Sequence, residues 1–294
     1  MKVLIAGANG FLGSNLINYY KGIHGCNLVT TSRKKPFDGS VPNITGDLLN
    51  LDFVKHLFDE EKPDFVINTV SLANVDECEE KPDFAREVVV ETARNVSFAA
   101  AEFGIKHVYI STDHLYDGSK NFYSEEDTVY PVNNYGRLKL EAENVSLGIN
   151  PNTIIVRTNF FGWSPPDHMK TFGEWVYSNL LDNKPMTLFT DYYFTPIEVS
   201  YLSEILHRVI LGGYIGIINI AGTERCSKFD FGITLAKMGG FDHSLITGSR
   251  MDLKSFKVRR PGDLSLSTYK LQNELDIKAP DLSEGIKRFL ANKS

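Results

Sequence analysis

Three polar residues have the types and spacing that could together reduce a ketone. Tyr135 and Lys139 are four positions apart, so they share one face of a helix if residues 133–148 are helical, as the Asn133-Asn134 start predicts. A phenol has a pKa of about 10 and is a poor acid or base at neutral pH, but a neighbouring ammonium favours the phenolate and lowers that pKa. Thr112 follows an apolar run, and its hydroxyl could hold a carbonyl oxygen. The pattern predicts an acid/base site.

A second tyrosine and lysine pair with the same spacing does not support this prediction. Tyr116 and Lys120 flank Asp117-Gly118-Ser119, a sequence typical of a turn. Because a turn separates side chains that a helix would bring together, we predict that this pair is not part of the acid/base site.

The N-terminal segment has the order of elements that a phosphate-binding turn requires. An apolar run at residues 3–6 predicts a buried strand, Gly7, Gly10 and Gly13 follow it, and a helical pattern continues through Leu16. Glycine permits a tight turn and lets the backbone approach a pyrophosphate at the start of a helix. The sequence therefore predicts a dinucleotide-binding unit.

The residues after the second predicted strand, at 28–31, indicate which dinucleotide binds. NAD-binding units usually carry Asp or Glu there, whereas this chain reads Ser32-Arg33-Lys34-Lys35. A 2′-phosphate is stabilised by cations and repelled by a carboxylate. We therefore predict NADPH as the cofactor, with NADH as the alternative.

Further cofactor contacts are expected where the next two strands end. Asp47 follows a short strand at 43–45 and could meet the adenine amino group, and small residues follow the strand at 65–68. The predicted cofactor-binding residues are Gly7, Asn9, Gly10, Phe11, Leu12, Gly13, Ser32, Arg33, Lys34, Asp47, Leu48, Val70, Ser71, Ala73 and Thr158.

The order of strand and helix patterns indicates the fold class. Strands and helices alternate from the N-terminus onwards, which predicts an α/β fold of the Rossmann type, with a doubly wound parallel sheet. We expect a loop at 74–80, one long helix at 83–103 ending at Gly104, and a last strand at 216–220. The predicted domains are a dinucleotide-binding domain at 1–158 plus about 191–222, and a smaller C-terminal substrate-binding lobe at 159–190 and 223–294.

The segment after the strand at 153–158 is rich in aromatic residues and prolines. Ligands of doubly wound folds bind at the carboxyl ends of strands, so Asn159, Phe160 and Trp163 are candidates for substrate binding. Core packing is the alternative for the aromatic residues, Phe161 included. Farther on, Arg259-Arg260 suggests recognition of an anion such as a diphosphate, with a simple surface turn as the alternative.

The overall composition excludes several classes of partner. The chain has 294 residues, of which 42% are hydrophobic and 23% charged, as in an ordinary globular protein. Its net charge of −6, without a long basic run, argues against nucleic acid and anionic membranes. The cysteines, Cys26, Cys78 and Cys226, have no disulfide or metal-ligand spacing, so we predict no metal site. Without a signal peptide or an apolar run of membrane-spanning length, a cytoplasmic location is expected.

These motifs together resemble the extended short-chain dehydrogenases/reductases over nearly the whole chain, and more narrowly the dTDP-4-dehydrorhamnose reductase family. The Gly7/Gly10/Gly13 spacing is typical of the superfamily. The narrower resemblance rests on Ser-Thr-Asp-His-Leu-Tyr-Asp-Gly at 111–118, on Asn-Tyr-Gly-Arg-Leu-Lys at 134–139, and on Arg157-Thr158 followed by aromatic residues.

The resemblance implies a reaction and a role for each residue of the site. Thr112 would orient the carbonyl of the sugar, Tyr135 would donate a proton, and Lys139 would lower the pKa of Tyr135 and hold the nicotinamide ribose. The implied reaction is the NADPH-dependent reduction of the C4 ketone of a nucleotide-linked 4-keto-6-deoxy sugar. The residues expected to bind the substrate are Asp113, His114, Asn159, Phe160, Trp163 and Arg260.

Two positions differ from the usual pattern of the family, and two alternative functions stay open. His114 stands where Tyr is usual and Val89 where Asn is common, so we expect a difference in the bases and sugars accepted. One alternative is a sugar-nucleotide epimerase or dehydratase with tightly bound NAD, although dehydratases typically have an acidic pair after the catalytic Thr. The other is a non-catalytic regulatory subunit that binds a dinucleotide and a partner enzyme. A nucleotide sugar is the expected partner, with a homodimer as an option.

Overall fold

The chain consists of two compact units. The computed structural model describes residues 1–34, 39–166, 168, 170–251 and 256–293. Unit 1 comprises Met1–Thr112, Asn133–Val156 and Val209–Ile218, and unit 2 comprises Asp113–Val132, Arg157–Arg208 and Asn219–Ser294. A division by packing does not test which residues bind which ligand, so the domain boundaries expected from the sequence stay a prediction.

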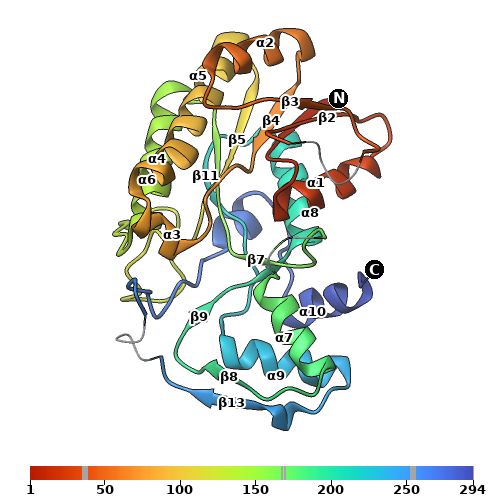
Figure 1. Cartoon of the computed structure of the whole chain (residues 1–294), viewed down its shortest axis with the longest axis vertical. Coiled ribbons are helices and arrows are strands. Elements are labelled where there is room, and N and C mark those ends of the chain that lie inside the picture. The colour runs from red at the N-terminus through yellow and green to blue at the C-terminus, as the bar shows by residue number, and fades with distance from the viewer. Residues whose placement is uncertain (35–38, 167, 169, 252–255, 294) are drawn as a thin grey trace. The chain divides into compact units, whose positions relative to one another are not determined.

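Unit 1 is built on a seven-stranded sheet whose strands follow the order β11-β6-β5-β4-β1-β2-β3 (Figure 1). Strand β1 pairs in parallel with β2 and β4, and the pairs β2–β3, β4–β5 and β5–β6 are also parallel. This architecture confirms the predicted α/β fold with a doubly wound sheet. The strands are β1 (Lys2–Ala6), β2 (Asn27–Ser32), β3 (Asn43–Thr45), β4 (Phe65–Asn68), β5 (Lys106–Ile110), β6 (Ile154–Arg157) and β11 (Gly216–Asn219).

Helices cover both faces of this sheet. On one face Leu4 and Val66 lie in a buried cluster with residues of α2 (Leu51–Glu61) and α5 (Thr92–Phe103), and α6 (Asn134–Ile149) packs beside α5. On the other face Tyr20 of α1 (Phe11–Lys21) lies against Phe65, with ring centroids 6.2 Å apart. Each helix thus buries an apolar stripe against the strands. Among the described residues, no helix combines the length and apolar composition needed to cross a membrane.

The segment from 74 to 103 differs from the sequence prediction. The expected loop at 74–80 is wrong, because residues Val75–Glu80 form helix α3, whose N-terminus is capped by the Asn74 side chain. The single helix expected at 83–103 consists instead of three successive segments, α4 (Pro82–Arg86), the π-helical segment η1 (Glu87–Glu91) and α5. The last of them ends at Gly104, as expected. Acidic residues favour the first turn of a helix, so the acidic run was a helix-start signal rather than a loop signal.

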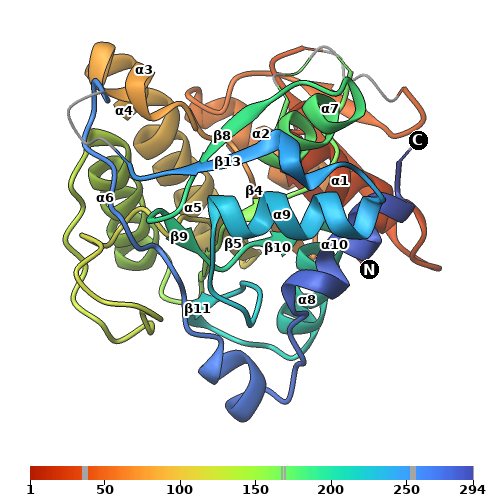
Figure 2. The same ribbon diagram turned by 90° about the horizontal axis from the view of Figure 1, so that it is seen from below.

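Unit 2 packs around an aromatic core. Phe161, Phe231 and Phe289 are fully buried there, and helix α9 (Lys228–Gly239) lies beside the strand pair β8 (Met186–Phe189) and β13 (Ile246–Ser249), as Figure 2 shows. Because β12 and β13 follow β11, the expectation that the strand at 216–220 is the last one is wrong. The other elements are β7 (Phe160–Phe161), α7 (Phe172–Leu181), β9 (Tyr193–Phe194), β10 (Ile197–Glu198), α8 (Val199–Leu211, whose end belongs to unit 1), β12 (Cys226–Ser227), η2 (His243–Leu245), η3 (Lys270–Glu274) and α10 (Leu282–Ala291).

Candidate functional site

A pocket in unit 1 lies where β1, β2, β3 and β4 end. Its lining begins directly after β1, with Gly7, and directly after β4, with Thr69, and its volume is about 390 Å³. The carboxyl edge of a parallel sheet is where doubly wound folds bind their ligands. The lining residues are Gly7, Asn9, Gly10, Thr31, Ser32, Arg33, Lys34, Gly46, Asp47, Leu48, Leu49, Thr69, Val70, Ser71, Val88 and Thr92.

The turn after β1 has a tight backbone conformation that requires glycine, and such a turn lets the backbone approach a phosphate closely. Gly7 has a φ of +90°, and a Cβ placed there would lie 2.6 Å from Thr69 Oγ1. A Cβ on Gly13 would lie 2.2 Å from the carbonyl oxygen of Gly7. Gly10 caps α1 without a side-chain hydrogen bond, and the start of a helix attracts anions because its first N–H groups have no partner within the helix. The turn is therefore a suitable cradle for a pyrophosphate.

The end of β2 presents cations to the pocket. Arg33 and Lys34 are exposed and line the pocket, and Ser32 lies before them with its hydroxyl bonded to the Lys34 carbonyl oxygen. Lys35 lies outside the described residues. The carboxylate in the pocket lining is Asp47, after β3, where its Oδ1 accepts a hydrogen bond of 3.0 Å from the Leu49 N–H. The residues present thus fit a dinucleotide with a 2′-phosphate.

Most of the residues that we expected around a cofactor line this pocket, and a few do not. Phe11, Leu12 and Gly13 belong to α1 and are outside the lining, Ala73 is exposed beyond it, and Thr158 belongs to unit 2. The cofactor role of each residue stays a prediction. The lining residues that sequence reasoning missed are Thr31, Gly46, Leu49, Thr69, Val88 and Thr92. Thr69 begins the run of small residues after the strand at 65–68 where the sequence places the cofactor, although it is not among the individually predicted contacts.

Lys139 is a buried cation on helix α6. Its side chain is almost completely buried, and Nζ donates a hydrogen bond of 2.6 Å to the carbonyl oxygen of Ile110, the last residue of β5. Nζ also lies 4.3 Å from the centroid of the Tyr109 ring. Burial lowers the pKa of Lys139 to about 7, against the charges of Glu143 and Cys78, which favour the ammonium. Lys139 is therefore poised between its charged and neutral forms near neutral pH.

Glu143 extends the buried polar face of α6 by one turn. It is 1% exposed and accepts a hydrogen bond from the Ser111 hydroxyl. Lys139 and Glu143 therefore bind two successive residues, Ile110 and Ser111, directly before Thr112. Sequence reasoning missed both Glu143 and Ser111. For Glu143 the available signal was its spacing, because it lies four residues after Lys139, just as Lys139 lies four residues after Tyr135.

Tyr135 stands in the first turn of α6, whose start is held in place by side chains. Asn133 caps the helix by accepting a hydrogen bond of 2.9 Å from the Gly136 N–H, as the sequence predicts. The Asn134 side chain donates to the Cys78 carbonyl oxygen at 2.6 Å. Tyr135 is half-buried against the apolar cluster beneath α6, and Thr112 is 4% exposed. The structure thus has Thr112, Tyr135 and Lys139 in the same unit as the glycine-turn pocket.

Several of the residues expected to bind substrate gather in unit 2. Asp113 is buried and accepts a hydrogen bond of 2.5 Å from the Asn159 side-chain amide. Burial, together with the charges of Arg260 and Lys228, lowers the pKa of His114 to about 3. His114 is therefore neutral at pH 7. Lys228 is the member of this group that sequence reasoning missed.

The aromatic residues after β6 are mostly core residues. Trp163 stacks on Phe289 with ring centroids 4.4 Å apart, and its indole N–H donates to the Phe289 carbonyl oxygen at 2.8 Å. Phe161 is 2% exposed, whereas Phe160 is half-buried. Core packing, the alternative that the sequence left open, therefore describes Phe161 and these contacts of the partly buried Trp163, and a role of Trp163 in substrate binding stays a prediction.

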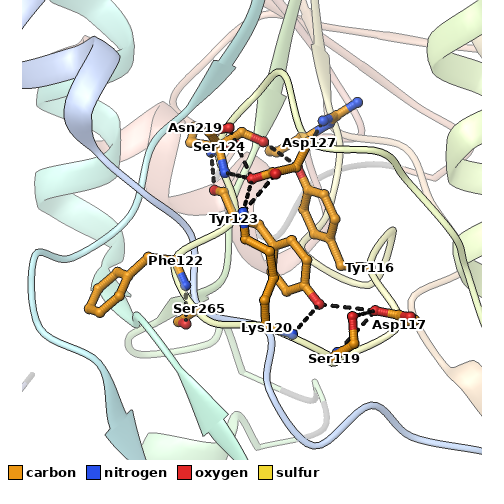
Figure 3. Close-up of polar contacts among 11 residues, drawn as sticks. Tyr116, Asp117, Ser119, Lys120, Phe122, Tyr123, Ser124, Asp127, Asn219 and Ser265 are labelled. Atoms are coloured by element: carbon orange, nitrogen blue, oxygen red, sulfur yellow. Dashed lines mark hydrogen bonds and ion pairs between the residues drawn. The ribbon is translucent and has the colours of Figure 1, made fainter.

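A turn separates the second tyrosine and lysine, as the sequence predicts, and each side chain makes its own structural contact. Tyr116 donates a hydrogen bond of 2.9 Å to the Ser124 carbonyl oxygen, and Lys120 forms an ion pair of 2.6 Å with Asp127 (Figure 3). Residues 116–120 are not helical. The two side chains thus brace the loop of unit 2 that contains them.

Comparisons with known proteins agree over the full length of the chain. The family model described as "RmlD substrate binding domain" matches residues 1–294. A relative from Haloferax volcanii, named "Probable low-salt glycan biosynthesis reductase Agl14", is 28% identical over 97% of this chain and 96% of its own length. The crystal structure of a dTDP-4-dehydrorhamnose reductase from Clostridium acetobutylicum has a TM-score of 0.83 and 28% identity, with 99% of each chain covered. A Bacillus anthracis dTDP-4-dehydrorhamnose reductase, in complex with NADP, shares the fold at 23% identity and a TM-score of 0.84, with 99% of each chain covered.

Proposed function

Because the chain belongs to the dTDP-4-dehydrorhamnose reductase family, and is thus an NAD(P)-dependent oxidoreductase of the extended short-chain dehydrogenase/reductase type, we propose that it reduces the C4 ketone of a nucleotide-linked 4-keto-6-deoxy sugar. One observation carries the proposal: Thr112, Tyr135 and Lys139 belong to the unit that holds the glycine-turn pocket, with Lys139 fixed against the end of β5. A proton donor and a dinucleotide pocket within one unit are what ketone reduction requires.

The pocket lining supports NADPH as the cofactor. Gly7 and Gly10 would hold the pyrophosphate, while Arg33 and Lys34 would hold the 2′-phosphate. When bound, the cofactor supplies the hydride for the ketone carbon. The similar dTDP-4-dehydrorhamnose reductase from Bacillus anthracis was solved in complex with NADP, which supports NADPH over NADH here. NADH remains the alternative, because Asp47 is also part of the lining.

The three polar side chains would each act on the carbonyl or on the proton. The Thr112 hydroxyl holds the ketone oxygen, and the Tyr135 hydroxyl donates its proton to that oxygen as the alkoxide forms. The ammonium of Lys139 stabilises the phenolate that Tyr135 leaves behind, which lowers the cost of the proton transfer. Because the pKa of Lys139 is lowered to about 7, this help weakens above neutral pH.

The test follows NADPH absorbance with a panel of nucleotide-linked 4-keto-6-deoxy sugars. Tyr135→Phe removes the proton donor, so we expect turnover to fall by about 100-fold or more while NADPH affinity stays within about twofold. Tyr130→Phe is the matched control, because Tyr130 is 70% exposed, and it should keep wild-type turnover. A Tyr135→Phe enzyme with a wild-type rate would refute the assigned role.

Two other results would point to the alternative functions. Protein that purifies with bound NAD and converts a nucleotide sugar without added cofactor would be an epimerase or dehydratase. Protein that binds a dinucleotide and a stoichiometric partner, yet oxidises no NADPH with any sugar of the panel, would be a regulatory subunit. The presence of His114 after Asp113, in place of an acidic pair, argues against a dehydratase. The retention of Thr112, Tyr135 and Lys139 together argues against a regulatory subunit.

A further inference from the structure

Asn95 ties helix α5 to the backbone that follows β3. It stands in the first turn of α5, and its side-chain Nδ2 donates hydrogen bonds of 2.9 Å to the carbonyl oxygen of Leu48 and of 3.0 Å to that of Leu49. The acceptors lie 47 and 46 positions away along the chain, so the contact joins separate elements of unit 1. A side-chain amide nitrogen has two N–H groups, and Asn95 thus has one for each carbonyl.

The segment that Asn95 holds is part of the wall of the glycine-turn pocket. Asp47, Leu48 and Leu49 all line the pocket, whereas Asn95 stands outside the lining. Thr92, three positions before Asn95 on the same helix, lines the pocket as well. Asn95 therefore lies behind the lining and connects two parts of it, the segment after β3 and the start of α5.

The bonds that shape the segment from within are local. The Asp47 Oδ1 atom accepts a hydrogen bond of 3.0 Å from the Leu49 N–H, and the Asp47 carbonyl oxygen accepts one of 3.0 Å from the Asn50 N–H. The Leu48 side chain is 6% exposed and packs in an apolar cluster with residues of α5, but an apolar contact has no preferred direction. Among these interactions, the hydrogen bonds from Asn95 are the directional ones that reach another element.

The position of the segment in the sheet fits the adenosine half of the cofactor. Arg33 and Lys34, the cations proposed for the 2′-phosphate, follow β2, and Asp47 follows β3, which pairs in parallel with β2. The adenine is bonded to the ribose that carries the 2′-phosphate, so it lies near these cations. The Asp47 carboxylate can accept a hydrogen bond from the adenine amino group, and the apolar lining suits the face of the ring.

We propose that Asn95 is a positioning residue for the adenine of NADPH: by holding the carbonyls of Leu48 and Leu49, it sets the place of Asp47 and thereby the affinity for the adenosine half of the cofactor. This inference rests on the cofactor of the proposed function and does not depend on the sugar. Asn95 acts through the backbone of the segment and not on the reacting atoms. Its loss should therefore raise the KM for NADPH and leave kcat within about twofold of wild type.

The decisive variants remove the N–H donors of Asn95 in two different ways. Asn95→Leu keeps the size of the side chain without a polar group, and Asn95→Ser stays polar but ends one bond short of the position of Nδ2. Both should bind NADPH and 2′,5′-ADP, the adenosine half of NADPH, about 10-fold more weakly, as expected for the loss of a pair of ordinary hydrogen bonds. Asn179→Leu is the matched control, because Asn179 also donates to a backbone carbonyl, that of Trp175 at 2.8 Å, but lies in α7 of unit 2. It should bind both ligands as wild type does.

Binding of the two ligands separates the positioning of adenine from a general loss of structure. The dissociation constants are measured by calorimetry under conditions in which urea unfolding shows each variant to be folded, so a change reports the site and not the amount of folded protein. The inference holds if NADPH and 2′,5′-ADP weaken by the same factor in both Asn95 variants, because the whole loss then lies in the adenosine half. It is wrong if 2′,5′-ADP binds either variant within twofold of wild type.

The outcomes also distinguish this inference from the proposed function. Weaker binding of 2′,5′-ADP by the Asn95 variants of a chain that reduces no sugar of the panel would overturn the proposed function and leave this inference standing. Reduction of a sugar by wild type, together with unchanged 2′,5′-ADP binding in the variants, would do the reverse. Wild-type protein that binds neither NADPH nor 2′,5′-ADP would overturn both.

Discussion

Substitution of Gly13 by alanine tests whether the close approach of α1 to the glycine turn is essential. A Cβ at this position would lie 2.2 Å from the Gly7 carbonyl oxygen and 2.9 Å from the Gly7 carbonyl carbon. Both atoms belong to the backbone, so no side chain can rotate away to make room. Ordinary contacts of this kind begin at about 3.3 Å, so the start of α1 would have to move by about 1 Å away from Gly7.

Two effects of opposite sign set the size of the change in stability. Alanine is favoured over glycine inside a helix by about 1 kcal/mol, whereas overpacking a fixed backbone costs about 1–3 kcal/mol. We therefore expect Gly13→Ala to lower the free energy of unfolding by up to about 2 kcal/mol. The displaced turn should also weaken NADPH binding by about 10-fold or more, since the same shift moves the N–H groups that face the pyrophosphate.

Gly148→Ala is the matched control for the intrinsic effect of the substitution. Gly148 lies in α6 and is exposed, and a Cβ there would meet nothing within 4 Å. This variant should be more stable than wild type by about 0.5–1 kcal/mol, with unchanged NADPH affinity. Urea unfolding and fluorescence titration with NADPH measure both quantities. If Gly13→Ala keeps wild-type affinity and stability, the close approach at Gly7 has no functional importance.

Two further predictions concern buried titratable groups. His107 is buried, with Nδ1 3.1 Å from the Ser97 hydroxyl, and burial lowers its pKa to about 3. Below pH 6.5 the imidazole is therefore protonated in the unfolded chain but stays neutral in the folded chain. This difference in protonation should lower the free energy of unfolding at pH 5 by about 2 kcal/mol relative to pH 7. Urea unfolding at both pH values should show a smaller loss in His107→Asn than in wild type. An equal loss would contradict the role of His107. Glu143→Gln keeps an acceptor for Ser111 but removes the charge that favours the ammonium of Lys139, so the alkaline limb of the kcat profile should move to lower pH by about one unit. The control is Glu141→Gln, because Glu141 lies on the same helix but pairs with Arg86 instead of facing Lys139. An unshifted profile in Glu143→Gln would mean that Glu143 has only a packing role.

Local sequence signals predicted much of unit 1. Asn133 caps α6 as the sequence predicts, because a cap depends on residues only three positions apart. The glycine turn after β1 was also readable, since it follows a strand and precedes a helix. Asn74 shows the limit of such signals, because it caps α3 although the acidic residues after it suggested a loop.

Contacts between residues distant in the sequence were beyond prediction. Glu143 meets Ser111 across 32 positions, and nothing in a single sequence pairs them. The rings of Phe172, Tyr192 and Phe194, which surround the ammonium of Lys228, come from α7, from β9 and from the segment before β9, which come together only when unit 2 folds. The packing of Trp163 on Phe289 was undecidable for the same reason, because aromatic residues after a strand can face a ligand or a core equally well.

The division of the chain into two units has a consequence for its evolution and for its engineering. The backbone passes from one unit to the other after residues 112, 132, 156, 208 and 218, so neither unit is a contiguous piece of sequence. A gene fragment that ends before residue 219 encodes only part of unit 2, and a single recombination event within residues 113–218 would split at least one of the two units. Such an interlaced chain is therefore expected to diversify through point substitutions within each unit, rather than through the shuffling of whole modules.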